Sequence, residues 1–294
     1  MGGSQSTQDT DFEYGKAWRD TPWGEKGHLE KTLKDFGLCD PNIKHARILV
    51  VGEIGAGKSS FINSVNSVFQ GRITNEALVN KTTDTSRTFT KLYKTYYIRN
   101  GQSPMPFVLT DTMGIESKNL HGIHQEDIVK AMEGCIKERY KFNPESPITP
   151  QDNSYRSNPS LQDQTYCLVF VIAADKISMA ADDNIYEKLK YIKSKADELE
   201  IPQVMILTRP DEACQLVKEN IRKVYTSKKI KEKLEECSAH TGISVSHIFT
   251  VKCYHEEIDT QDDMDVLILR AFKHIVHMAN DALRLKCDEK ENSE

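Results

Sequence analysis

Residues 47–61 read RILVVGEIGAGKSSF, and this stretch decides the fold. Its first five residues are mostly apolar and end at Gly52, a pattern typical of a buried parallel strand. From Ser59 to Phe69 the apolar residues lie at helical spacing, and Gly71 follows the expected helix end. A glycine-rich turn between a buried strand and a helix predicts a loop that binds phosphate groups.

The turn itself matches the pattern G-x-x-x-x-G-K-[ST]. In such a loop the backbone N–H groups surround the β- and γ-phosphates, Lys58 reaches the same phosphates, and the Ser59 hydroxyl binds Mg²⁺. A chance glycine-rich turn is the alternative, but the correct strand and helix on both sides favour binding of a nucleoside triphosphate. We expect nucleotide contacts from Gly52, Glu53, Ile54, Gly55, Ala56, Gly57, Lys58, Ser59 and Ser60.

Strand and helix patterns alternate through the rest of the chain. We expect further strands at 88–98, 107–110, 167–173, 204–207 and 247–251, and helices at 125–139, 182–199, 213–225, 228–239 and 262–285. The polar, proline-containing stretch 143–164 is expected to be a long loop. Alternation of this kind predicts an α/β fold, a mostly parallel sheet with helices on both faces. With the phosphate loop, this becomes a P-loop NTPase with a Ras-like G domain.

The expected domain occupies residues 46–285. A polar lead, 1–45, precedes it with a short helix at 30–36, and its Trp18 and Trp23 are expected to pack on the domain, because a chain rarely leaves two indoles exposed. Residues 286–294 are expected to form an acidic, disordered tail.

A second motif follows the apolar stretch 107–110, where Asp111 and Gly114 form D-x-x-G. Alone, this tetrapeptide is usually a turn. Downstream of a P-loop, an aspartate at a neighbouring strand end can hold Mg²⁺, and Gly114 can offer its N–H to the γ-phosphate. Between the two motifs, one of four threonines is expected to close over Mg²⁺ as the switch residue: Thr82, Thr83, Thr85 or Thr88.

A third motif, Thr208-Arg209-Pro-Asp211, follows the expected strand 204–207. It resembles the [N/T]-K-x-D element that reads guanine, in which the carboxylate accepts two N–H bonds from the base. Arg209 departs from the usual lysine. The alternative is that Asp211 caps a helix. A last guanine-contacting loop is expected near Lys252.

The composition of the chain argues against several further classes of protein. Lysine and arginine number 39 against 44 acidic residues, a net charge of −5 with a pI near 6.0. This balance argues against a general nucleic-acid binder. The longest apolar run, 167–174, is far too short to span a bilayer, and no secretory leader is evident. Seven cysteines without a C-x-x-C pair indicate free thiols in a reducing compartment, so a cytoplasmic protein is expected.

Several longer segments carry a family resemblance. They are the continuation of the P-loop through residues 55–71, together with 18–23, 139–144, 158–162 and 265–269. Over about residues 15–285 the chain resembles the interferon-induced protein 44 family, including its 44-like branch. The resemblance implies a cytoplasmic GTP-binding protein of the vertebrate interferon-induced antiviral response, with GTP or GDP and Mg²⁺ as cofactors. Some members carry an additional N-terminal TLDc domain, for which this chain is too short.

The residue after D-x-x-G bears on hydrolysis. Ras-like enzymes place a glutamine there to orient water, whereas this chain has Ile115, so hydrolysis is expected to be slow unless Glu116, His121, His124 or a partner supplies the group. Ile54 also crowds the route of an arginine finger. His121 and His124 could suggest a metal site, but no further ligands stand at suitable spacing.

Residues 1–6, MGGSQS, match the N-myristoylation pattern, with a disordered polar start as the alternative. A single acyl chain on Gly2 would give at most reversible membrane association. The leading hypothesis is a slow GTPase that acts as a nucleotide-gated switch, with a nucleotide-dependent homodimer and an immune-signalling partner. The alternatives are a non-enzymatic immune adaptor with a degenerate G domain, or an ATP-binding P-loop protein.

Overall fold

A six-stranded sheet in the order β2-β3-β1-β4-β5-β6 forms the centre of the fold. The computed structural model describes residues 12–77, 92–117, 122–177 and 183–291. Strand β2 is antiparallel to β3, and the other neighbouring pairs are parallel. The strands are β1 (Ala46–Gly52), β2 (Lys94–Asn100), β3 (Ser103–Asp111), β4 (Thr165–Ala173), β5 (Gln203–Thr208) and β6 (Ile248–Val251).

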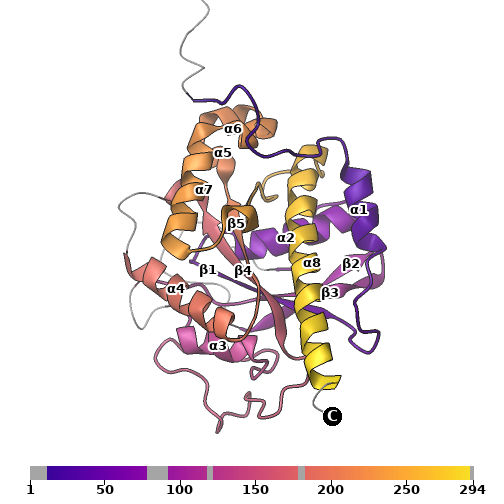
Figure 1. Ribbon diagram of the computed structural model, residues 1–294, viewed down its shortest axis with the longest axis vertical. Coiled ribbons are helices and arrows are strands. Elements are labelled where there is room, and N and C mark those ends of the chain that lie inside the picture. The colour runs from indigo at the N-terminus through magenta and orange to yellow at the C-terminus, as the bar shows by residue number, and fades with distance from the viewer. Residues whose placement is uncertain (1–11, 78–91, 118–121, 178–182, 292–294) are drawn as a thin grey trace, which may run out of the picture.

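Helices cover both faces of this sheet (Figure 1). One face packs against α1 (Lys26–Lys34), α2 (Lys58–Gln70) and α8 (Asp262–Glu291), and the other against α3 (Gln125–Met132), α4 (Asp183–Glu198) and α7 (Lys228–Thr241). Alternate residues of one strand serve the two faces: Ile48 and Val50 of β1 join the first core, and Leu49 and Val51 join the second. The predicted α/β architecture with a mostly parallel sheet is confirmed.

Some elements differ from their predicted bounds. The helix expected over 125–139 ends at Met132, because the chain turns at Gly134, which has a φ of +84°. The helix expected over 213–225 is divided into α6 (Gln215–Glu219) and the 3₁₀ segment η2 (Ile221–Tyr225), and a further short helix, α5 (Pro210–Ala213), ends at its first residue. Two further 3₁₀ segments, η1 (Ala174–Lys176) and η3 (Val245–His247), were not predicted.

The structure also contradicts the expectation that residues 286–294 form a disordered tail. Helix α8 continues to Glu291, so the tail is helical over most of its length. Its side chains explain the extension, because Lys286 donates a hydrogen bond of 3.0 Å to Gln164, and the Cys287 thiol lies 3.7 Å from an Asp40 carboxylate oxygen. An acidic composition therefore did not prevent this segment from packing. The stretch 143–164 contains no helix or strand, as expected of a loop.

The lead before β1 lies along the domain in Figure 1, where it is drawn in indigo. The Trp18 ring meets Tyr225 edge-on, with 5.1 Å between ring centres. The Arg19 guanidinium lies 5.3 Å from the centre of each of these two rings. Trp23 packs against both apolar cores. Both indoles thus contact the domain, and the lead from residue 12 onward is an integral part of the packed structure.

Sheet register brings the three sequence motifs to one edge. Val50 of β1 is paired with Asp111 of β3, and Thr208 of β5 is paired with Val251 of β6. Because these strands are parallel, the loops that follow them leave from the same edge of the sheet. The described residues contain no helix that is long and apolar enough to cross a membrane.

Candidate nucleotide-binding site

The glycine-rich loop between β1 and α2 follows a backbone path that side chains would obstruct. Gly52 has a φ of +153°, and a Cβ atom there would lie 2.1 Å from the Val171 carbonyl oxygen of β4. The loop therefore passes against the neighbouring strand before it enters α2. Such a turn leaves the first N–H groups of the helix directed toward the loop, as phosphate binding requires.

The Lys58 side chain lies across this loop and is held by backbone carbonyl groups of the loop. Its ammonium group donates hydrogen bonds to the carbonyl oxygens of Gly52, at 3.1 Å, and Glu53, at 2.9 Å. The side chain is 7% exposed. Burial lowers the pKa of Lys58, while the nearby carboxylates of Asp111 and Glu53 act in the opposite direction. A cation is thus positioned beside the backbone that would surround phosphate.

The first two motifs meet through a hydrogen bond. The Ser59 hydroxyl donates to a carboxylate oxygen of Asp111 over 2.7 Å, although the two residues are 52 positions apart. The Asp111 side chain is buried at the end of β3. A hydroxyl and a carboxylate are oxygen donors of the kind that Mg²⁺ prefers beside nucleotide phosphates. The residues present therefore fit a magnesium ion.

The segment after Asp111 lies directly on the P-loop. A Cβ atom on Gly114 would lie 2.4 Å from the Ile54 side chain, so glycine alone allows this approach. Ile115 donates its N–H to the Gly52 carbonyl over 3.0 Å, and its own carbonyl accepts the Ile54 N–H at 3.3 Å. The Ile115 side chain is 2% exposed. The position after D-x-x-G is therefore a buried aliphatic group that cannot orient water.

The third motif also contacts the P-loop. The Thr208 hydroxyl, which is buried, donates to the Ala56 carbonyl oxygen over 2.6 Å. The Arg209 guanidinium donates to the Gly55 carbonyl oxygen over 2.9 Å. The residues expected to contact phosphates and those expected to contact a base are thus joined by direct hydrogen bonds.

Asp211 faces the loop that follows β6. Its carboxylate forms an ion pair with Lys252, with 3.3 Å between oxygen and nitrogen. Lys252 forms a second ion pair, also at 3.3 Å, with Glu257. Asp211 lies in the first turn of α5, as the helix-capping alternative assumed, yet its carboxylate is directed to Lys252. The sequence does not predict a role for Glu257, because no motif marks the loop after β6.

The candidate groups for hydrolysis are dispersed. His124 is the N-cap of α3, where its ring nitrogen Nδ1 accepts the Glu126 N–H over 3.3 Å. The Glu116 carbonyl accepts a hydrogen bond of 2.7 Å from Lys188. Among the residues that the structure describes, no group of three or more histidine, cysteine or acidic side chains could hold a metal ion. The remaining candidates, His121, Thr82, Thr83, Thr85, Thr88 and Gly2, lie outside the described residues.

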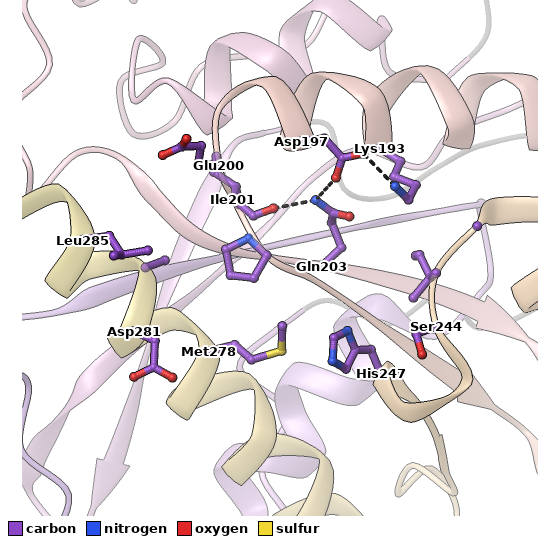
Figure 2. Close-up of a pocket in the computed structure, with 14 residues that line it drawn as sticks. Lys193, Asp197, Glu200, Ile201, Gln203, Ser244, His247, Met278, Asp281 and Leu285 are labelled. Atoms are coloured by element: carbon purple, nitrogen blue, oxygen red, sulfur yellow. Dashed lines mark hydrogen bonds and ion pairs between the residues drawn. The ribbon is translucent and has the colours of Figure 1, made fainter.

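A separate cavity lies at the opposite edge of the sheet, where the parallel strands begin (Figure 2). Its volume is about 580 Å³, and side chains of α4, α8 and the segments that precede β5 and β6 line it. Asp197 accepts hydrogen bonds there from Gln203, at 2.9 Å, and Lys193, at 2.6 Å (Figure 2). The residues of the three motifs do not line this cavity, so it is distinct from the candidate nucleotide site.

Comparison with known proteins agrees with this geometry. Residues 47–209 match the family model described as 50S ribosome-binding GTPase. The match covers more than half of the chain and contains the P-loop, the D-x-x-G segment and the first two residues of the third motif, and the chain belongs to this family of GTPases.

Its relatives include interferon-induced protein 44-like of Homo sapiens, 30% identical over 88% of this chain and 57% of the relative. They also include interferon-induced protein 44 of Homo sapiens, 35% identical over 86% of this chain and 56% of the relative, and that of Mus musculus, 33% identical over 87% and 60%. The predicted resemblance is thus confirmed, and the chain spans a little over half the length of these relatives. Among solved structures, the chain is similar to Toc33 of Arabidopsis thaliana in complex with GDP and Mg²⁺, with a TM-score of 0.47 and 15% identity over 87% of this chain and 91% of that one.

Proposed function

We propose that this chain binds guanine nucleotide with Mg²⁺ and acts as a slow, nucleotide-gated switch. The observation that carries the proposal is the meeting of two other motifs on the P-loop. Asp111 of D-x-x-G is hydrogen-bonded to Ser59, and Thr208 and Arg209 of the third motif are hydrogen-bonded to Ala56 and Gly55. D-x-x-G alone is a common tetrapeptide, but its convergence with the other two motifs at one sheet edge is the arrangement that nucleotide recognition needs.

The phosphate side rests on Lys58 and the N-terminus of α2. Lys58 would neutralise phosphate charge, and the N–H groups of the loop would donate to phosphate oxygens. Ser59 and Asp111 would hold Mg²⁺, which neutralises charge that develops on the phosphates when bound.

The base side rests on Asp211. An ionised carboxylate can accept two parallel N–H bonds from guanine, and adenine does not offer the same pair of donors. Lys252 keeps cationic charge beside Asp211, and Arg209 extends from the same turn to the P-loop. The Asp211 carboxylate, as an acceptor for these two donors, favours a guanine nucleotide over ATP.

Slow hydrolysis follows from the aliphatic Ile115. A methyl-bearing side chain has no hydrogen-bonding atom with which to orient a water molecule for attack on phosphate. We expect single-turnover hydrolysis no faster than about 10⁻⁴ s⁻¹, the order of magnitude of unassisted Ras-type enzymes. Faster turnover would require a group from a partner.

The first experiment is a titration of the purified protein with fluorescent GTP, GDP and ATP analogues in the presence of Mg²⁺. Selective binding of the guanine analogues, lost in Lys58→Ala, would support the proposal. Selective binding of the ATP analogue, unaffected by Asp211→Ala, would support the ATP alternative and overturn guanine recognition.

The second candidate function is a non-enzymatic immune adaptor, and the packing of Ile115 on the P-loop favours it. The backbone of Ile115 is hydrogen-bonded to Gly52 and Ile54, close to where a γ-phosphate would approach. A scaffold of this kind would give the same oligomeric state with GDP and with a non-hydrolysable GTP analogue. A switch would change it, for example to a homodimer, which light scattering after size-exclusion chromatography measures directly.

We also propose a role in the interferon response, on the basis of the names of the relatives. Such a protein would accumulate after interferon treatment of cells that encode it, and would fractionate with the cytoplasm. Immunoblotting of treated and untreated cell fractions tests both points, and unchanged abundance after treatment would contradict the role.

A further inference from the structure

The loop after β6 carries an ion-pair cluster at the base side of the site. Lys252 lies between two carboxylates, Asp211 and Glu257, with 3.3 Å to each. Side-chain exposure falls from 27% for Lys252 to 21% for Asp211 and 12% for Glu257. Because all three are substantially shielded from water, their charges act on one another more strongly than surface ion pairs do.

Glu257 is the best-fixed member of this cluster. One of its carboxylate oxygens accepts the N–H groups of His255, at 3.0 Å, and Glu256, at 3.3 Å, while the other pairs with Lys252. Burial opposes its ionisation, but the backbone hydrogen bonds and Lys252 together lower the pKa of Glu257 below its ordinary value. These contacts favour the ionised form of Glu257, which anchors the Lys252 ammonium.

The loop that bears Lys252 and Glu257 is anchored by Tyr254, which lies between them in the sequence. Tyr254 donates its backbone N–H to the Ser64 hydroxyl of α2 over 2.9 Å. Its phenol donates to an Asp265 carboxylate oxygen over 2.6 Å and accepts the Gln261 N–H at 2.7 Å. The position of Glu257 is thus set relative to α2, the helix after the P-loop. A Lys252 side chain that moved closer to Asp211 would lose its ion pair with Glu257.

The net charge of the cluster decides how strongly Lys252 neutralises Asp211. With Glu257 present, two carboxylates share one ammonium group, and the cluster keeps a net negative charge. The Asp211 carboxylate can then accept hydrogen bonds from the N–H donors of a base. Without Glu257, Lys252 would neutralise Asp211 alone, and a base would have to compete with an ammonium group for the same oxygens.

We propose that Glu257 is a specificity-determining positioning residue, which holds Lys252 so that Asp211 remains available to the two N–H donors of guanine. The inference rests on the proposed guanine-nucleotide function and deepens it. It assigns a role to a residue that belongs to none of the three motifs.

The test compares GDP with inosine diphosphate, whose base lacks the exocyclic amino group and offers one N–H donor to Asp211. Glu257→Gln retains the size of the side chain and an oxygen for the backbone N–H groups, but removes the charge. We expect its Kd for GDP to rise about tenfold and its preference for GDP over inosine diphosphate to fall by at least about threefold. The matched control is Glu256→Gln, an 83% exposed neighbour in the same loop, which should change neither quantity.

A double-mutant cycle separates positioning from a merely structural role. If Glu257 acts through Lys252, adding Glu257→Gln to Lys252→Met should leave the Kd for GDP unchanged within about twofold. An equal loss in both backgrounds would overturn the inference, as would an unchanged preference in the single variant. Should Glu257→Gln lower the melting temperature, Glu257→Asp retains the charge and is expected to preserve the base preference.

The same titrations distinguish this inference from the proposed function. Wild-type protein that binds ADP as tightly as GDP would overturn guanine recognition, and the role of Glu257 with it. Wild-type protein that prefers GDP, with a Glu257→Gln variant that keeps the full preference over inosine diphosphate, would overturn the role of Glu257 alone.

Discussion

The Thr208 hydroxyl donates a hydrogen bond of 2.6 Å to the Ala56 carbonyl oxygen, across 152 positions of sequence. This bond fixes the end of β5 on the P-loop, so the two halves of the candidate site are held at a set distance. A ligand that binds both halves then needs little rearrangement of either.

Thr208→Val tests this bond, because valine keeps the shape and removes the hydroxyl donor. We expect the free energy of unfolding to fall by about 1–3 kcal/mol, the usual penalty for a buried carbonyl that loses its partner. GDP affinity should also fall. Chemical denaturation and nucleotide titration measure the two effects. Thr250→Val on β6 is the control: within the described part of the chain the buried Thr250 hydroxyl has no hydrogen-bond partner, so its loss should be neutral.

Arg209 is expected to tolerate lysine but not methionine. Its guanidinium donates to the Gly55 carbonyl oxygen, and a lysine at this position can supply one donor to the same oxygen. GDP binding by Arg209→Met should weaken about tenfold, as expected for one hydrogen bond from a charged donor, and binding by Arg209→Lys should weaken less. Arg222→Met, which removes an exposed ion pair with Asp263, should leave binding unchanged. Equal weakening of GDP binding by Arg209→Lys and Arg209→Met would show that a positive charge at position 209 does not contribute to binding.

His124 is expected to act in folding rather than in hydrolysis. Because its ring caps α3, His124→Ala should lower the free energy of unfolding by about 1 kcal/mol, and His124→Asn, a residue favoured at this position, should restore most of it. Single-turnover GTP hydrolysis should be the same in both variants as in the wild type. A hydrolysis rate lost in both, with stability restored in the second, would instead make the imidazole catalytic.

Asp127 predicts a pH dependence of stability. Burial raises its pKa to about 6, although hydrogen bonds from the Ile148 N–H and the Tyr140 hydroxyl favour the ionised form. A pKa raised in the folded state stabilises the protein below the unfolded pKa of about 3.9, and this contribution is lost as the pH rises through about 6. The loss is on the order of 3 kcal/mol from this group.

Urea denaturation at pH 4.5 and pH 7.5 measures the larger part of this effect, about 2 kcal/mol, because pH 4.5 lies between the unfolded and folded pKa values. Asp127→Asn should reduce the loss of stability between the two pH values, since asparagine does not titrate. An identical pH dependence in variant and wild type would assign it to other groups.

The sequence predicted the P-loop, the D-x-x-G segment and the fold because each depends on local patterns. A short β-branched run before Gly52 and a one-sided helix after it leave few alternatives for the chain between them. The pairing of Ser59 with Asp111 was predictable for the same reason, since both lie where parallel strands end.

Other features depend on contacts between distant segments, and no local pattern could reveal them. The helical tail is stabilised by contacts of Lys286 and Cys287 with residues more than 100 positions away. The ion pair of Lys252 with Asp211 forms only when the loop after β6 lies beside α5. The division of the expected helix 213–225 likewise has no clear signal, because its apolar residues keep helical spacing while the backbone does not.

Helix α8 contains 30 residues, so at 1.5 Å per residue it is a rigid rod about 45 Å long. Its first turn holds Tyr254 through Asp265, beside the loop of Lys252, and its last turns line the cavity of Figure 2 with Met278 and Leu285. A single rigid element, packed on the sheet from Met264 to Leu283, therefore joins the base side of the candidate site to the wall of a distant cavity.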